Sequence, residues 1–247
     1  DGSGGGVVGR AEPLQRLGEV VTASVNGRSS AVLVSGEAGI GKTSLIRAAI
    51  EGATADSAPG SAVVGWGTCW HGDGAPGFWP WMQAFDEVAN AVGRDVASAA
   101  AGYDAGLLSL LIRELGAPES AAGDPDGHRL LLLDAAAGWL ETLAADRHVV
   151  VVLDDLQWAD SSTFDLIDYV IGTPRAARLL VIGAFRHDEL DQERRARLAT
   201  IGSHARGVHL DGLTVDGVEE LIRAIPGPPA SRSLAIDLHR RTGGHPL

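Results

Sequence analysis

A glycine-rich segment between an apolar run and a helical pattern most constrains what this chain can fold into. Residues 36–43 read Gly-Glu-Ala-Gly-Ile-Gly-Lys-Thr and match the pattern G-x-x-x-x-G-K-[ST]. The apolar run 31–34 precedes them, and residues 44–50 have helical spacing. This order of strand, loop and helix is typical of a loop that cradles phosphate groups. The alternative is a plain Gly-rich turn, which the flanking elements disfavour.

The residue types of this loop suit a nucleotide. Glycines let the backbone curl, so that successive N–H groups face phosphate oxygens, and the following helix adds the positive end of its dipole. Lys42 is the only lysine of the chain, and it is expected to reach the β- and γ-phosphates. The Thr43 hydroxyl is expected to bind Mg²⁺. The predicted nucleotide-binding residues of the loop are Gly36, Glu37, Ala38, Gly39, Ile40, Gly41, Lys42, Thr43 and Ser44.

A second strong signal is a continuous β-branched run, residues 148–153, that ends in the carboxylates Asp154 and Asp155. Such a run predicts a parallel strand buried on both faces. Its end lies at the carboxyl edge of the sheet, where open α/β sheets bind ligands. This is the pattern of a Walker B element, in which Asp154 holds Mg²⁺ and Asp155 orients or deprotonates the attacking water. The alternative is a strand that merely ends in a polar turn.

Another apolar run, residues 179–184, is followed closely by Arg186. An arginine at that edge of the sheet can sense or stabilise the charge of a γ-phosphate. The alternative is a surface arginine paired with Asp188 or Glu189. From the residues alone, both interpretations stay open.

Strand patterns alternate with helical patterns from residue 31 to about 210, which predicts an α/β fold of the P-loop NTPase class. We expect a mainly parallel sheet with helices on both faces, followed by the start of a small helical lid. Residues 1–6 are predicted to be a flexible leader, 7–212 the nucleotide-binding core and 213–247 a truncated lid segment. Short helices are expected in residues 93–127, and a break at residues 226–229.

Three local predictions accompany this organisation. Thr214 is expected to cap a helix, and Ser162 and Asp165 have the spacing of a capping box. Arg194, Arg195 and Arg197 are expected on a solvated helix face.

Residues 69–81 contain or adjoin four of the six tryptophans and are interrupted by Gly and Pro, so regular structure is expected only from about Trp81. We interpret the rings as packing this loop over the core. The alternative is stacking on a base or contact with a partner. A metal site at His71 and Asp73 is disfavoured, since no clustered ligands accompany them.

Composition limits the classes of function. The 247 residues are 45% hydrophobic, enough for one large core, and the formal net charge of −12 argues against nucleic-acid binding by this segment itself. The lone Cys69 excludes an intramolecular disulfide and a cysteine-based zinc site. No run is long enough for a membrane span and no signal peptide is visible, so a cytoplasmic location is expected. The abrupt ends suggest a fragment of a longer protein.

With both phosphate-site motifs placed, the chain resembles the signal-transducing STAND class of P-loop ATPases. More narrowly, it resembles the ATPase module of large ATP-binding LuxR-type regulators, and residues 70–81 resemble actinobacterial members. The resemblance spans nearly the whole chain and is most specific at residues 154–160. The segments that carry it are Val8-Gly9-Arg10, residues 36–43, residues 152–160, Ala184-Phe185-Arg186 and residues 243–247.

The resemblance implies further roles. Val8, Gly9 and Arg10 would lie against the adenine, Arg186 would act as a nucleotide-state sensor, and Pro246 would close a helical lid over the base. Members usually carry acidic residues where this chain has Ala11 and Pro13. The backbone contact to adenine does not need these acidic side chains, so the resemblance still implies it. No side-chain role toward the nucleotide is expected at these two positions.

The function expected from this resemblance is ATP binding with slow Mg²⁺-dependent hydrolysis, with ATP and ADP as the two states of a regulatory switch. The partners would be effector or DNA-binding domains of a longer chain, with self-association as a further option. One alternative is an AAA-type oligomeric remodeller, for which Arg175 or Arg178 could serve as the arginine finger. Others are a small-molecule kinase and a non-hydrolysing module in which Asp155 is only structural.

Overall fold

The computed structural model describes residues 7–27, 29–55, 58, 60–72, 74, 76–116, 125–172, 177–225 and 231–246. The predictions for the leader 1–6, Asp73, Arg175 and the break at 226–229 lie outside these described residues.

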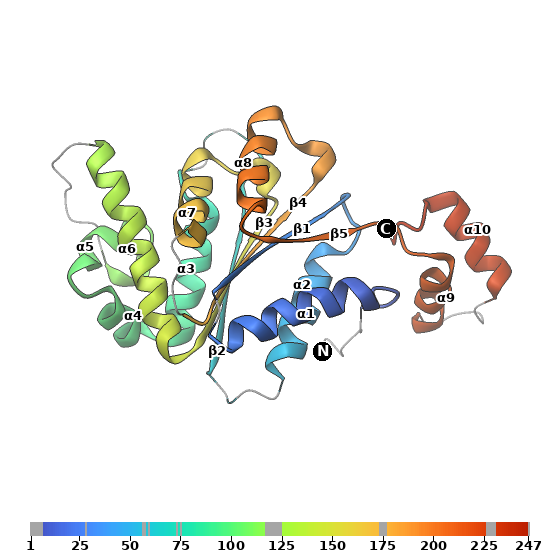
Figure 1. The fold of residues 1–247 in the computed structure, drawn as a ribbon, viewed down its shortest axis with the longest axis horizontal. Helices are drawn as coiled ribbons and strands as arrows, with labels where there is room; N and C mark the ends of the chain where they lie inside the picture. The colour runs from blue at the N-terminus through green and yellow to red at the C-terminus, as the bar shows by residue number, and fades with distance from the viewer. Residues whose placement is uncertain are drawn as a thin grey trace.

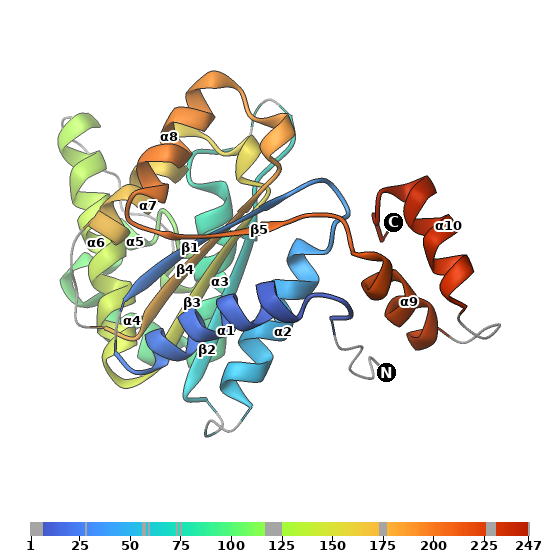
Figure 2. The same ribbon diagram turned by 45° about the vertical axis from the view of Figure 1, so that its right-hand side comes forward.

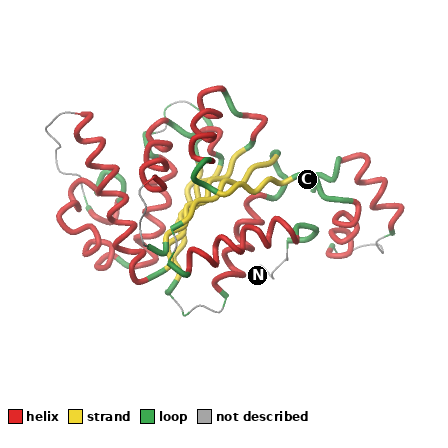
Figure 3. The backbone as a smooth tube through the Cα atoms, viewed as in Figure 1, coloured by secondary structure: helices red, strands yellow, loops and turns green. Residues whose placement is uncertain are grey.

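Five parallel strands form a single sheet at the centre of the molecule (Figure 3). The strand order is β2-β3-β4-β1-β5, and each neighbouring pair is parallel, which confirms the predicted α/β fold with a parallel sheet. Because all five strands run in the same direction, their carboxyl ends lie at one edge of the sheet. The strands are β1 (Ser30–Gly36), β2 (Ala62–Thr68), β3 (His148–Asp154), β4 (Leu179–Phe185) and β5 (Arg206–Leu210).

Helices cover both faces of this sheet (Figures 1 and 2). One face carries α1 (Ala11–Val25) and α2 (Lys42–Thr54). The other face carries a larger layer, and within it α4 and α5 are the short helices expected after residue 93. This layer consists of α3 (Trp79–Val92), α4 (Arg94–Ala101), α5 (Ala105–Leu108), α6 (Pro125–Asp146), α7 (Ser161–Gly172) and α8 (Gln192–Gly202).

The interior strand β3 shows why residues 149–153 are continuously apolar. Val149, Val151 and Leu153 pack with the larger helical layer, whereas Val150 and Val152 pack with α1 and α2. All five side chains are 0% exposed. A strand buried on both faces needs apolar residues at every position, not at alternate ones.

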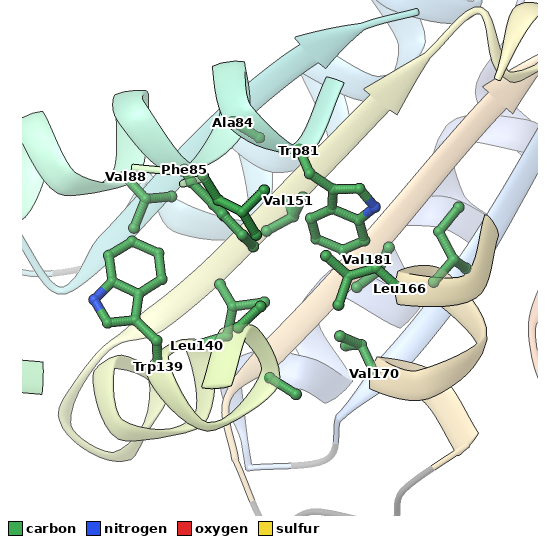
Figure 4. Packing of buried hydrophobic residues seen from close by; sticks show 14 of the residues in the cluster. Trp81, Ala84, Phe85, Val88, Trp139, Leu140, Val151, Leu166, Val170 and Val181 are labelled. Carbon is green, nitrogen blue, oxygen red and sulfur yellow. The ribbon is translucent and has the colours of Figure 1, made fainter. Parts of the chain in front are cut away.

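Aromatic side chains fill the space between the sheet and α3, α6 and α7 (Figure 4). Phe85 contacts both Trp81 and Trp139, with ring centroids 5.3 Å apart in each pair. Trp81 is fully buried, and its indole N–H donates to the carbonyl of Thr163 at 3.1 Å. Of the tryptophans around residues 69–81, Trp81 therefore packs in the core as interpreted, whereas Trp70 is 55% exposed.

Helix α3 lies unusually close to strand β2. A Cβ added at Gly65 would lie 2.2 Å from the carbonyl oxygen of Ala84, and one at Gly67 would lie 1.8 Å from that of Pro80. The helix begins at Trp79, two residues earlier than expected, because Pro80 sits in the first turn, where no backbone N–H is needed.

The predicted capping box at the start of α7 is wrong. Asp160, not Ser162, caps this helix, and its carboxylate accepts the backbone N–H of Thr163 at 3.0 Å and the Thr163 hydroxyl at 2.6 Å. Asp165 instead forms ion pairs with Arg129 and Arg197. The carboxylate needed for the box is therefore engaged elsewhere.

The prediction of a solvated arginine face on α8 is wrong for two of its three members. Arg194 donates through Nε to the carbonyl of Ala159 at 3.0 Å. Arg197 pairs with Asp165 and, at 3.3 Å, with Asp168 of α7. Only Arg195 is exposed as expected. These contacts join α8 to α7 beside the carboxyl edge of the sheet.

Two C-terminal helices, α9 (Val215–Ala224) and α10 (Arg232–Thr242), stand beside the sheet region (Figure 1). Thr214 caps α9 by accepting the N–H of Gly217 at 3.2 Å, which confirms that prediction. The pair has a small core of its own that contains Leu213, Val218 and Ala235. None of the helices in the described part of the chain is long and apolar enough to cross a membrane.

Candidate nucleotide-binding site

The loop of residues 36–43 leaves the end of β1 and enters α2 through Gly41. Gly41 has φ of 102°, a left-handed conformation that glycine adopts without strain. Lys42 is only 7% exposed, and its ammonium group donates to the carbonyls of Gly36 at 2.9 Å and Glu37 at 2.8 Å. Burial and the positive charge of Arg186 lower the pKa of Lys42.

The Walker B strand meets this loop directly. The Thr43 hydroxyl donates to Oδ2 of Asp154 at 3.0 Å. Oδ1 of the same carboxylate accepts the backbone N–H of Asp155 at 2.9 Å. Burial raises the pKa of Asp154, and the hydrogen bond from Thr43 opposes that shift. The structure therefore brings the two residues predicted to bind Mg²⁺ into contact.

Asp155 and Arg186 approach each other at the ends of β3 and β4. Nη2 of Arg186 lies 3.5 Å from Oδ1 of Asp155, while Nη1 donates to Glu189 at 2.8 Å. The hydrogen bond to Glu189 raises the pKa of Arg186. Both interpretations of Arg186 thus describe part of its environment, since it pairs with the half-buried Glu189 and also faces the second Walker B aspartate.

These side chains line one pocket of ≈ 390 Å³. The loop, the two strand ends and the segment after α10 all contribute to it. Pro246 therefore lies beside the phosphate loop although 203 residues separate it from Thr43 (246 − 43). The lining residues are Gly39, Gly41, Lys42, Thr43, Ser44, Asp154, Asp155, Arg186 and Pro246.

Other predicted residues lie around this pocket without lining it. Glu37 and Ile40 line a neighbouring polar pocket of ≈ 270 Å³ together with His187, His209 and His245. Ala38 is exposed at the tip of the loop, and Gly36 is buried at the end of β1.

The N-terminal residues predicted to lie against adenine contact the loop and the C-terminal helices. Arg10 is 7% exposed, and its guanidinium donates to the carbonyl of Ile40 at 3.1 Å and to that of Asp211. The backbone N–H of Gly9 donates to Glu220 of α9 at 3.2 Å. Val8 is half-buried. The role of Val8, Gly9 and Arg10 toward adenine stays a prediction.

Two polar residues of this region, Gln157 and Glu220, were not predicted from the sequence. Gln157 is 1% exposed and bonds to both Asp155 and Arg186. The only signal was its position in the acidic string after the strand. Glu220 lies on an amphipathic helix, and no sequence signal distinguishes it from the neighbouring Glu219.

A protein-family model described as an AAA ATPase domain matches residues 6–182 of this chain. The match covers more than half of the sequence and includes both phosphate-site motifs. The chain therefore belongs to the AAA ATPase domain family. No curated protein sequence matched it.

Three solved structures are similar to this chain. A STAND protein with a tetratricopeptide repeat sensor from Pyrococcus horikoshii is 17% identical with a TM-score of 0.47; the match covers 92% of this chain and 28% of that one. The Aeropyrum pernix ORC2 protein, in ADPNP and ADP complexes, is 15% identical with a TM-score of 0.44. This match covers 87% of this chain and 51% of that one. Drosophila ORC bound to DNA is 14% identical with a TM-score of 0.47. This match covers 96% of this chain and 51% of that one. The chain thus spans between about a quarter and about half of these proteins' chains.

Proposed function

We propose that this chain binds ATP with Mg²⁺, hydrolyses it slowly and acts as a nucleotide-controlled switch in a larger signalling or transcription regulator of the STAND type. The observation that carries this proposal is the convergence of Lys42 and Thr43 with Asp154, Asp155 and Arg186 on one pocket. Pro246 of the C-terminal segment lines the same pocket, so that segment is placed to respond to what the pocket holds.

The donor set at Thr43 and Asp154 fits Mg²⁺. A hydroxyl and a carboxylate 3.0 Å apart are hard oxygen ligands, and Mg²⁺ in nucleotide sites is typically held by one or two carboxylates plus phosphates and water. When bound, Mg²⁺ would neutralise the charge that develops on the β- and γ-phosphate oxygens. Lys42 would exchange its bonds to Gly36 and Glu37 for phosphate oxygens.

The second Walker B aspartate would act in the hydrolytic step. Asp155 would orient a water and accept its proton as the water oxygen bonds to the γ-phosphorus. The bond between the γ-phosphorus and the bridging oxygen breaks, and ADP leaves with its electron pair. Arg186 would stabilise the charge that develops on the transferred group. Its proximity to Asp155, 3.5 Å, supports this assignment.

Contacts of Arg10 support coupling between the nucleotide and the C-terminal helices. The Arg10 guanidinium bonds to the phosphate loop at Ile40 and to Asp211, the residue that follows β5. Two residues further on, the N–H of Leu213 donates to the carbonyl of Gly244 at 2.7 Å. A conformational change in the phosphate loop would therefore alter the contacts of residues 211–213, which lead into α9. Such coupling cannot exceed the difference in affinity of the two nucleotides for the two arrangements.

The proposed organisation is a nucleotide-binding core at 7–212 and a lid segment at 213–247. The separate small core of α9 and α10 supports that boundary. The proposed partners are effector or DNA-binding domains of a longer cytoplasmic protein, with possible self-association. The net charge of −12 argues against DNA contact by this segment itself.

The experiment compares wild-type protein with Asp155→Asn. We expect wild-type protein to convert ATP to ADP slowly, and Asp155→Asn to bind ATP with similar affinity while hydrolysis falls by about 100-fold or more. Hydrogen exchange at residues 211–213 should differ between the ATP-bound variant and the ADP-bound wild type. The matched control is Asp95→Asn, which changes an exposed carboxylate of α4 and should leave hydrolysis unchanged.

Two results would contradict the proposal. An ATP hydrolysis rate in Asp155→Asn equal to that of the wild type would contradict the catalytic role of Asp155. Identical exchange at residues 211–213 with ATP and with ADP would leave a nucleotide-binding module but no switch. Nucleotide-dependent ring assembly would favour the oligomeric remodeller instead.

A further inference from the structure

Gln157 occupies an unusual position for a glutamine in a short turn. It lies in a 3₁₀ turn, Leu156–Trp158, directly after the Walker B aspartates, yet its exposed fraction is only 1%. A buried amide is costly unless its donor and acceptor are satisfied. Here both are, which makes the contacts of this side chain informative.

The amide of Gln157 joins the ends of two neighbouring strands. Its Nε2 donates to Oδ1 of Asp155 at 2.8 Å, and its Oε1 accepts the backbone N–H of Arg186 at 3.1 Å. The side chain therefore bridges the predicted catalytic carboxylate after β3 and the backbone of the predicted sensor arginine after β4. This bond also fixes which end of the amide carries the oxygen, since only that end can accept from Arg186.

Asp155 needs such support because its backbone is strained. It has φ of 57° and ψ of 41°, a left-handed conformation that few residues other than glycine adopt. Residues in this region persist when their surroundings hold them in place, and they concentrate at functional sites. Gln157 and Nη2 of Arg186 both contact Oδ1 of Asp155. With Oδ1 engaged, Oδ2 is the oxygen of this carboxylate that can orient a water or accept its proton.

We propose that Gln157 is a positioning residue for ATP hydrolysis. Its hydrogen bond to Asp155 sets the rotation of that carboxylate. Its second hydrogen bond, to the backbone of Arg186, keeps the carboxylate at a fixed position relative to the end of β4. Gln157 touches neither nucleotide nor water in this role, and the inference rests on the proposed function of Asp155. A glutamine that served only to fill a buried polar space would affect stability but not the catalytic step.

Two variants separate these roles. Gln157→Met keeps the length of the side chain but removes both hydrogen bonds. We expect kcat for ATP hydrolysis to fall by about 10- to 100-fold with ATP affinity within about twofold of wild type, since small displacements of a catalytic group have effects of this size. The control is Gln83→Met, which removes the bonds from Gln83 to the carbonyls of Thr68 and Trp79 outside the proposed machinery and should leave kcat unchanged.

Gln157→Glu supplies a readout that a structural role would not give. At high pH the new carboxylate repels Asp155 and lacks a donor, so kcat should be low. Burial and the adjacent negative charge raise the pKa of such a carboxyl. Once protonated, it donates through its hydroxyl to Asp155 and still accepts from Arg186. The ratio of its kcat to that of wild type should therefore rise as the pH falls from about 8 to about 6, while the same ratio for Gln157→Met stays flat.

The outcomes are distinguishable. Wild-type hydrolysis together with unchanged kcat in both Gln157 variants would overturn this inference alone. Reduced kcat with the same pH profile in the Met and Glu variants would also overturn it, because a general loss of packing explains both. A wild-type protein that binds ATP but never hydrolyses it would overturn the proposed function and this inference with it.

Discussion

The Thr43 hydroxyl and the Asp154 carboxylate lie 3.0 Å apart although 111 residues separate them in the chain. Thr43 lies in the first turn of α2 and Asp154 ends β3, so their contact fixes the relative position of the phosphate loop and the Walker B strand end. A short hydroxyl side chain can make this contact only if both elements reach the same point at the edge of the sheet.

The first prediction concerns this pair. Thr43→Val keeps the shape of the side chain but removes the hydroxyl, so the affinity for ATP in the presence of Mg²⁺ should fall by about 10- to 100-fold, the size expected for a bond to a charged group. Thr43→Ser retains the hydroxyl and should stay near the wild-type affinity. With Mg²⁺ removed by a chelator, the three proteins should bind ATP with similar affinity. A loss in Thr43→Val that is equally large without Mg²⁺ would contradict the metal assignment.

The second prediction uses Lys42 as the only lysine of the chain. Protein labelled with ¹⁵N-lysine should give a single side-chain NMR signal. Its pKa should lie below the ordinary value of 10.5, because burial and Arg186 both disfavour the charged form. Addition of ATP should raise this pKa, since phosphate charges favour the protonated amine. Arg186→Gln should raise it in the free protein. A pKa that does not respond to ATP would place the phosphates away from Lys42.

The third prediction tests the close packing of α3 on β2. A Cβ at Gly67 would lie 1.8 Å from the carbonyl oxygen of Pro80, and backbone cannot move away cheaply. Gly67→Ala should therefore lower the free energy of unfolding by about 1–3 kcal/mol. Gly52→Ala is the matched control, since nothing lies within 4 Å of its Cβ in α2, and it should raise the free energy of unfolding by about 0.5–1 kcal/mol. Denaturant unfolding measures both changes.

The fourth prediction concerns pH. His148 is 3% exposed and its Nε2 lies 2.8 Å from the Ser24 hydroxyl; burial and the charge of Arg178 lower its pKa from 6.5 to about 4. The fold therefore holds the neutral ring, whereas the unfolded chain binds a proton below pH 6.5. As the pH falls from 6.5 to about 4, the free energy of unfolding should decrease, by up to about 3 kcal/mol.

The control for this pH dependence is the comparison of two variants. His148→Gln removes the buried titrating group and should flatten the slope of unfolding free energy against pH in this window. His204→Gln changes an exposed histidine and should keep the wild-type slope. Equal slopes in all three proteins would show that His148 is not held neutral.

Much of the fold could be predicted because its signals are local. Residues 149–153 are apolar at every position because helices cover both faces of β3, and the glycine-rich loop is read from eight consecutive residues. That Thr43 and Asp154 lie at the same edge of the sheet follows from the parallel strands, which bring their carboxyl ends to one edge. Pro246 lines the pocket, and its role in closing a lid stays a prediction.

The remaining errors and omissions depend on contacts between distant elements. Whether Gln157 faces solvent or Asp155 depends on where β4 places the N–H of Arg186, which no local pattern encodes. Likewise, Arg197 is taken out of solvent by carboxylates on α7, and the same pairing removes Asp165 from the predicted capping box. Side-chain partners of this kind are chosen by helix packing and not by spacing within one helix.

The central claim is that Lys42 and the Walker B aspartates serve a single magnesium–nucleotide site. Calorimetric titration of the folded protein with ATP and Mg²⁺ tests it most directly, with Lys42→Met as the matched variant and circular dichroism to verify its fold. We predict binding of about one nucleotide per chain to the wild type, as expected for one P-loop, and no measurable binding to Lys42→Met. Absence of binding to the wild type, or equal affinity in the variant, would contradict the account.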